Sequence, residues 1–400
     1  MLLLHLGLFG NFEKVKGRDG FFTLCRWKQC YNDTKTIVMT SVKDLDMKKI
    51  LTIFILLTSL FFSSVRGQSE TQYKDILVSN NIIWALTNDG NIKLFDATNG
   101  NQLDKNISAD SSIILMSKDN NGNPVIANKK KQLKRYNRSN NTWELVGQFD
   151  AEPFGIFVDS KGSYFSITSK GIQDLDTKQF YFKKNSLNQQ ITYRDEWSKP
   201  YSFYIDKNDI IWLGFDYGEW GGDLFAFQTN NKKFIDLTLS NFEIALGPIK
   251  SFFEDSTSLY FSTGLDHFRT SGNIVKVDSL KVSILLESKS HWSEPTGKDS
   301  IRTRIDGEYI GPATFNPFNN SIYFYSQNGF FFGDKTNDLS KIENWEKVVS
   351  PNLTWKYGQP NAVGSPMNVL KLCIIDKTRF VFLSQNDGIG FYDGLKVTML

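Results

Sequence analysis

IDKNDIIWLGFDYGEWGGDLFAF, residues 205–227, is the stretch that decides the fold of this chain. It contains an apolar segment rich in Ile and Trp, a Gly-containing turn, and a second segment rich in Phe. β-Branched and aromatic residues favour strands, and Gly, Asn and Asp readily adopt the positive φ angles of tight hairpins. The stretch therefore predicts two antiparallel strands that follow a tight turn.

The same unit recurs along the chain. Clear copies occupy residues 78–96 and 375–393, and weaker copies occupy residues 124–136, 157–176, 253–278 and 315–334. When the second strands of all units are aligned, their central residues are separated by 42, 39, 47, 48, 63 and 58 positions. These central residues are Trp84, Ile126, Phe165, Trp212, Tyr260, Tyr323 and Val381.

Seven copies predict an all-β fold, a single β-propeller of about seven four-stranded blades over residues 68–400. The count leaves six or eight blades open. The first four steps match one blade each, and the last two match a blade plus a polar insertion. One blade cannot cover both of its apolar faces, so neighbouring blades must pack face to face. We expect the repeated Trp residues to pack between blades and the repeated Asp residues to cap turns.

The pattern over residues 206–227 resembles the two-component regulator propeller repeat of bacterial hybrid sensor ectodomains, and residues 80–96 are similar to it. The resemblance is good in two or three blades. It is loose in the others, where Phe, Tyr or Val replaces Trp. It implies a propeller of the sensor-ectodomain type, here without a kinase module.

Residues 47–67, MKKILTIFILLTSLFFSSVRG, have the anatomy of a signal peptide. Two lysines precede an apolar run over residues 50–62, which small and polar residues follow. The run is shorter than the roughly 20 residues of a membrane span. We predict a cleaved signal peptide, with an uncleaved anchor as the alternative, and a secreted or periplasmic protein. Residues 1–46 are then an upstream extension that arose as a gene-model artefact.

Removing residues 1–67 changes the charge and the cysteine content. The full chain has a formal charge of +3, but residues 1–67 carry 10 Lys and Arg against 5 Asp and Glu. The remainder is near neutral, which disfavours nucleic acid as a partner. Of three cysteines, Cys25 and Cys30 are lost and Cys373 remains, so no internal disulfide forms. Export without disulfides favours a bacterial origin.

Loop lengths indicate which face of the propeller is functional. In a four-stranded meander, the loops between strands two and three and those between blades emerge on one face. The long loops fall at these positions, over residues 183–201, 216–223, 264–273, 288–312 and 350–368. Their aromatic, Arg and carboxylate residues suit a glycan, peptide or protein ligand. The candidate binding residues are Arg194, Trp197, Tyr217, Glu219, Trp220, Asp266, His267, Arg269, His291, Trp292, Arg302, Arg304, Tyr309 and Trp355.

A non-enzymatic binding protein is the preferred interpretation. The alternative is a hydrolase or lyase acting on a carbohydrate or lactone, with His267 or His291 as acid or base beside Glu219 and Arg302. These two histidines are the only ones after the signal segment, which excludes a three-His metal site. We expect no cofactor. Calcium held by carbonyls and acidic loops stays open.

Overall fold

The computed structural model describes residues 72–105, 107, 109, 111–183, 200–218, 221–239, 247–266, 270–293, 302–354 and 369–400. All of them belong to one compact unit, Thr71–Leu400. The predicted signal peptide and upstream extension lie outside the described residues. Within these ranges, no helix has both the length and the apolar character needed to cross a membrane.

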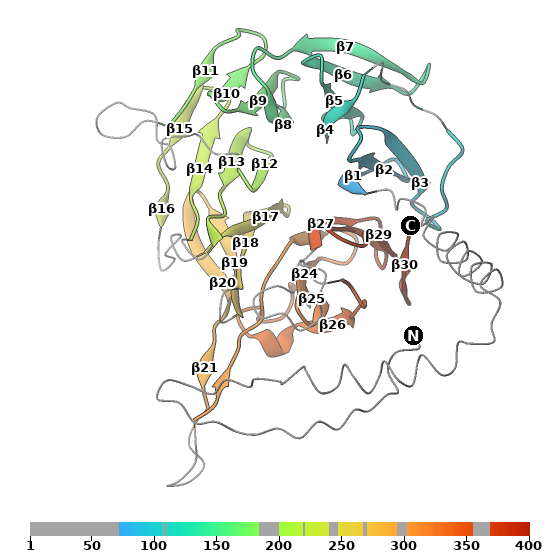
Figure 1. Ribbon diagram of the computed structural model, residues 1–400. Helices are drawn as coiled ribbons and strands as arrows, with labels where there is room; N and C mark the ends of the chain where they lie inside the picture. Colours follow the sequence, from blue (N-terminus) through green and yellow to red (C-terminus); the bar gives the residue numbers. More distant parts are fainter. Residues whose placement is uncertain are drawn as a thin grey trace, which may run out of the picture. The chain divides into compact units, whose positions relative to one another are not determined.

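Seven antiparallel sheets follow one another along the described chain (Figure 1). Blades 1 and 2 contain β1 (Tyr73–Ser79), β2 (Ile82–Thr87), β3 (Ile92–Asp96), then β4 (Ile113–Lys118), β5 (Pro124–Asn128), β6 (Gln132–Asn137) and β7 (Thr142–Gln148). Blades 3 and 4 contain β8 (Pro153–Val158), β9 (Tyr164–Thr168), β10 (Gly171–Asp174), β11 (Phe180–Tyr181), then β12 (Ser202–Ile205), β13 (Ile210–Gly214), β14 (Leu224–Gln228) and β15 (Lys233–Ile235). Blade 5 contains β17 (Ile249–Glu254), β18 (Leu259–Asp266), β19 (Thr270–Asp278) and β20 (Lys281–Ser288). Blades 6 and 7 contain β23 (Ala313–Asn316), β24 (Ser321–Ser326), β25 (Gly329–Asp334), β26 (Glu346–Val349), then β27 (Val369–Ile374), β28 (Phe380–Ser384), β29 (Gly388–Tyr392) and β30 (Val397–Met399).

Two blades depart from the simple meander. In blade 1 the place of the fourth strand is taken by residues 101–103, where Gln102 bridges to Phe95 and the Leu103 N–H donates to the Leu94 carbonyl at 2.8 Å. Blade 5 gains an outer fifth strand, β16 (Thr238–Leu239), which pairs in parallel with β20. The chain leaving blade 4 therefore crosses to the edge of blade 5 before it enters that blade.

The blades close into a ring through their first strands. Each of β1, β4, β8, β12, β17, β23 and β27 contacts the next, and β27 contacts β1. Blade 1 comes wholly from the start of the unit and blade 7 wholly from its end, so no strand is exchanged where they meet. Blades 1 and 7 are joined instead by buried side chains, such as Ile76 and Val381. An ion pair between Asp75 and Lys371 (Oδ1–Nζ 2.7 Å) also joins them. The protein is a seven-bladed β-propeller.

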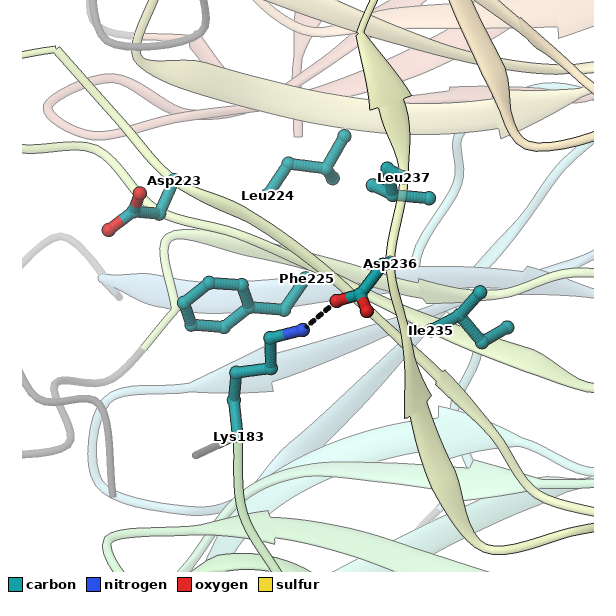
Figure 2. A pocket seen from close by; sticks show the side chains of 7 residues that line it. All are labelled: Lys183, Asp223, Leu224, Phe225, Ile235, Asp236 and Leu237. Atoms are coloured by element: carbon teal, nitrogen blue, oxygen red, sulfur yellow. Dashed lines mark hydrogen bonds and ion pairs between the residues drawn. The ribbon is translucent and has the colours of Figure 1, made fainter. Parts of the chain in front are cut away.

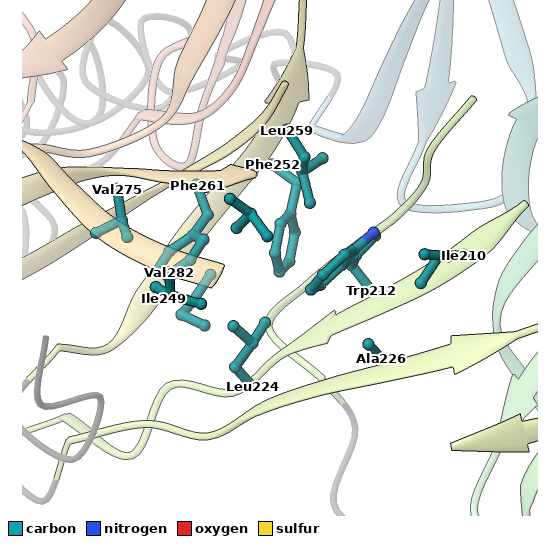
Figure 3. Packing of buried hydrophobic residues seen from close by; sticks show 11 residues of the cluster. Ile210, Trp212, Leu224, Ala226, Ile249, Phe252, Leu259, Phe261, Val275 and Val282 are labelled. Carbon is teal, nitrogen blue, oxygen red and sulfur yellow. The ribbon is translucent and has the colours of Figure 1, made fainter. Parts of the chain in front are cut away.

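The apolar core lies between the blades. Seven buried clusters lie along the ring, each shared by two adjacent blades. Figure 3 shows the cluster between blades 4 and 5, where Trp212 of β13 lies beside Phe252 and Leu259. All seven predicted central residues lie in the second strand of a blade and are buried, which confirms the predicted blade count and strand positions.

The turns between strands one and two define one face, which we call the turn face. The Asp206 carboxylate accepts backbone N–H groups of Asn208 and Ile210, each at 2.9 Å, and also the Trp212 indole N–H at 2.9 Å. Asp119 and Asp159 accept N–H groups in the same way in their own blades. The prediction that the repeated aspartates cap turns is confirmed.

The opposite face carries the loops between strands two and three and between blades, and we call it the loop face. The loop predicted over residues 264–273 is wrong over most of its length, because β18 and β19 extend into it and Gly264 pairs with Gly272. A Cβ on Gly264 would lie 2.4 Å from the Ile310 carbonyl oxygen, and one on Gly272 would lie 2.4 Å from the Ile310 nitrogen. These glycines allow a close backbone approach between blades 5 and 6 and do not mark a turn.

Candidate functional site

The predicted loop over residues 288–312 contains a two-stranded hairpin. β21 (His291–Trp292) pairs antiparallel with β22 (Arg304–Ile305), with His291 opposite Ile305 and Trp292 opposite Arg304. We call residues 289–293 and 302–306 the arm. In Figure 1 the arm extends away from β20 of blade 5.

Apolar side chains are exposed on both faces of the arm. Trp292 is 61% exposed and Ile305 is 46% exposed. Because successive strand residues point to opposite faces, Trp292 shares one face with Arg304, and Ile305 shares the other with His291. An isolated hairpin of this size is marginally stable in water and leaves apolar surface that another molecule can cover.

The base of the arm is fixed to blade 5. The Thr270 hydroxyl donates to the Gly307 carbonyl at 2.6 Å, and the Ser290 hydroxyl donates to the Thr270 carbonyl at 3.0 Å. Within the arm, Arg304 and Asp306 form an ion pair (Nη2–Oδ1 2.8 Å). Hydrogen bonds at its base thus hold the arm in place while its side chains face solvent.

Of the residues in the catalytic alternative, the structure describes His291 and Arg302. Both are exposed in the arm, and neither side chain has a hydrogen bond or ion pair with any described residue. A catalytic histidine is commonly oriented by a hydrogen bond from its ring to a third group. The described geometry contains no such pair.

A second group lies at the ends of inner strands of blades 4 to 6, on the loop face. Lys250 of β17 forms an ion pair with Asp216, which follows β13, and both side chains are nearly buried. The Lys250 ammonium is 5.0 Å from the ring centroid of Tyr201 and 5.9 Å from that of Tyr309, within the range of cation–π attraction. Tyr325 of β24 lies beside Tyr309, since a Cβ on Gly311 would be 2.8 Å from a Tyr309 ring carbon and 3.5 Å from a Tyr325 ring carbon. We call Tyr201, Asp216, Lys250, Tyr309 and Tyr325 the inner cluster.

Tyr309 was predicted as part of a long loop, and the structure places it in the interior. Its ring fills a slot between two glycines, because a Cβ on Gly264 or Gly311 would lie within 2.8 Å of ring carbons. Burial is the main cause that raises the pKa of the Tyr309 hydroxyl well above its usual range, and electrostatic interaction with Tyr201 and Asp216 adds to it. The hydroxyl therefore keeps its proton. Asp266, at the end of β18, is also within electrostatic range of it.

Tyr217 lies near the inner cluster but has a different role. Its hydroxyl donates to Asp223 Oδ2 at 2.9 Å. Burial raises the pKa of Asp223, and the hydrogen bond from Tyr217 partly offsets that shift. Tyr217 thereby fixes the loop between β13 and β14.

A pocket of about 170 Å³ lies on the outer part of blade 4 (Figure 2). Across it Lys183, which follows β11 of blade 3, forms an ion pair with Asp236 (Nζ–Oδ1 2.5 Å). No predicted site residue lines it. The lining residues are Lys183, Asp223, Leu224, Phe225, Ile235, Asp236 and Leu237.

The structure thus separates the predicted residues into an arm and an inner group. Half of the candidates lie outside the described residues, namely Arg194, Trp197, Glu219, Trp220, His267, Arg269 and Trp355. In the described part of the chain, no three His, Cys, Asp or Glu residues are grouped to hold a metal ion.

Sequence reasoning missed Tyr201, Asp216 and Lys250. The available signal was a lysine in an otherwise apolar first strand, in the sequence IKSFF at residues 249–253. Its partner is 34 positions earlier in another blade. Only the closed ring brings the two charges together.

No protein-family model matches the chain, and no curated protein matches its sequence. Solved structures with a similar fold include virginiamycin B lyase from Staphylococcus aureus, which is 9% identical with a TM-score of 0.47 over 81% of this chain and 95% of that one. The WD40 repeats of RRP9 are 9% identical with a TM-score of 0.49 over 80% and 89% of the two chains. The computationally designed Ika8 protein is 15% identical with a TM-score of 0.45 over 83% and 87%. We draw no conclusion about function from these likenesses.

Proposed function

We propose that this chain is an exported, non-enzymatic binding propeller that holds a partner protein with its arm. The observation that carries the proposal is the exposure of Trp292 and Ile305 on opposite faces of a hairpin. Trp and Arg dominate the binding energy of protein interfaces, and the arm offers Trp292 beside Arg304. Because hydrogen bonds fix the base of the arm, binding requires less ordering of the chain.

Export rests on the signal-peptide pattern over residues 47–67. The resemblance of residues 206–227 to two-component regulator propeller repeats supports an extracytoplasmic role in recognition. His291 supports binding over catalysis, since it lies exposed in the arm and no described carboxylate orients it. A histidine in that position suits an interface better than proton transfer.

Replacing Trp292 by alanine is expected to weaken partner binding by about 30-fold or more, as for a central interface tryptophan. Ile305→Ser should act in the same direction with a smaller effect. The partner would be isolated from the envelope fraction of the native host with the wild-type propeller, identified by mass spectrometry, and titrated against each purified variant by calorimetry. Both variants should unfold at the wild-type temperature, because neither side chain is buried.

Leu395→Ala is the matched control. Leu395 is 89% exposed, and it lies in the turn between β29 and β30, on the turn face. The Leu395→Ala substitution should leave the affinity for the partner protein unchanged. Equal affinity of wild type and Trp292→Ala, or a loss with Leu395→Ala, would contradict a role for the arm.

A further inference from the structure

Two nearly buried tyrosine hydroxyls of the inner cluster have no hydrogen-bond partner among the described residues. Tyr309 is 5% exposed and Tyr325 is 6% exposed. Among the other buried tyrosines of the described chain, Tyr136 donates to Asn141 Oδ1 at 2.8 Å and Tyr260 donates to Asp255 Oδ2 at 2.9 Å, whereas no hydrogen bond is described for the hydroxyls of Tyr73 and Tyr392. A phenol hydroxyl that bonds no protein group can donate to and accept from a ligand.

The third tyrosine of the cluster is partly exposed. Tyr201 precedes β12 and is 45% exposed. Its hydroxyl also lacks a partner in the described chain. Burial of the hydroxyl end and the nearby Asp216 raise the pKa of Tyr201 to about 12, so this hydroxyl stays neutral and can both donate and accept.

The charges of the cluster are already matched. Lys250 is paired with Asp216 and also lies against the Tyr201 and Tyr309 rings. An anionic ligand would have to compete with Asp216 for the ammonium, and a cationic ligand would have to compete with Lys250 for the carboxylate. A purely apolar ligand would leave the phenol hydroxyls without partners.

The ligand that fits these groups is neutral, carries many hydroxyls and has one apolar face. We propose that the inner cluster is a saccharide-binding site, in which Tyr201 packs against the C–H face of a sugar ring and the Tyr309 and Tyr325 hydroxyls bond its hydroxyls. Sugar hydroxyls donate and accept, as phenols do. Aromatic rings supply rigid apolar area for the C–H face.

This site goes beyond the arm-mediated interaction and does not depend on it. None of its five residues belongs to the arm. A variant of the arm and a variant of the inner cluster should therefore affect different ligands.

The test uses variants that remove only a hydroxyl. Tyr309→Phe and Tyr325→Phe keep the ring in its slot, and since neither hydroxyl has a described protein partner, both should unfold at the wild-type temperature. The wild-type propeller would be titrated by calorimetry with short cello-, malto-, xylo- and manno-oligosaccharides. At least one should bind, and each Phe variant should bind it about threefold to tenfold more weakly, the loss expected for one hydrogen bond. Tyr201→Ala should weaken saccharide binding further than either Phe variant does.

Two controls make the result specific. Tyr136→Phe removes a paired hydroxyl far from the inner cluster, so its unfolding temperature should fall while saccharide affinity stays unchanged. Trp292→Ala should bind the saccharide as wild type does, which separates this proposal from that of the arm. The proposal is overturned if no oligosaccharide binds the wild-type protein, if Tyr309→Phe and Tyr325→Phe bind as tightly as wild type, or if both fail to fold.

Discussion

Trp212→Ala is expected to lower the free energy of unfolding by about 3–5 kcal/mol, the usual range for removing a buried Trp side chain. The indole fills the space between blades 4 and 5, against Phe252 and Leu259 (Figure 3). Its N–H also bonds Asp206 at 2.9 Å. The variant therefore leaves both a cavity between two blades and a turn carboxylate without one of its partners.

Thermal unfolding followed by circular dichroism would measure this loss. For a unit as long as Thr71–Leu400, about 4 kcal/mol corresponds to a fall in Tm of roughly 6 °C. Trp292→Ala removes the same side chain from the exposed arm and should leave Tm within about 1 °C, as surface substitutions do. A Tm for Trp212→Ala equal to that of Trp292→Ala would show that the contacts between blades do not carry the stability.

The same contrast between tryptophans explains what the sequence could predict. Trp84 and Trp212 stand in apolar strands that recur with a period of one blade, and a strand buried on both faces must lie between two others. That local pattern was sufficient to place the second strand of all seven blades. The local sequence was also sufficient to predict that Asp206 caps a turn, because such an aspartate accepts from N–H groups two and four residues later.

Contacts between distant parts of the chain could not be predicted in this way. Asp216 and Lys250 belong to different blades, and nothing in either strand alone identifies its partner. Gly264 was predicted to be a loop residue because a glycine in a turn and a glycine in a strand that a neighbouring backbone approaches closely look the same in the local sequence. Tyr309 looked exposed for the related reason that the slot it fills is built by residues from other segments.

Asp255→Asn is expected to lower the free energy of unfolding at neutral pH by about 3 kcal/mol, as when one partner of a buried ion pair is removed. The Asp255 carboxylate is buried between blades 5 and 6 and forms an ion pair with Lys335. Its other contacts are the Tyr260 hydroxyl at 2.9 Å and the backbone N–H groups of Thr257 and Ser258 at 2.6 and 2.8 Å. An amide replaces the oxygen that faces Lys335 and Tyr260 with a donor, so the contact with the Lys335 ammonium is lost and the Tyr260 hydroxyl has to accept instead of donate.

Acid unfolding gives the more specific readout of the same residue. Burial acts to raise the pKa of Asp255, but Lys335 and the backbone N–H groups of the turn outweigh it and hold the pKa well below its usual range. Since the folded-state pKa lies below the unfolded-state value of about 4, the unfolded chain takes up a proton first as the pH falls. The contribution of Asp255 is therefore complete at neutral pH and is lost below about pH 4.

Urea unfolding at a series of pH values from neutral to acidic should therefore show a smaller acid-induced loss of stability for Asp255→Asn than for wild type. The two stability curves should converge at low pH, where the wild-type carboxyl is protonated as well. Asp278→Asn is the matched control, because Asp278 is largely exposed and its Oδ2 lies 3.5 Å from the Lys276 ammonium, an exposed pair that contributes about 1 kcal/mol at most. Parallel curves for wild type and Asp255→Asn would mean that the ion pair across blades 5 and 6 does not govern acid stability.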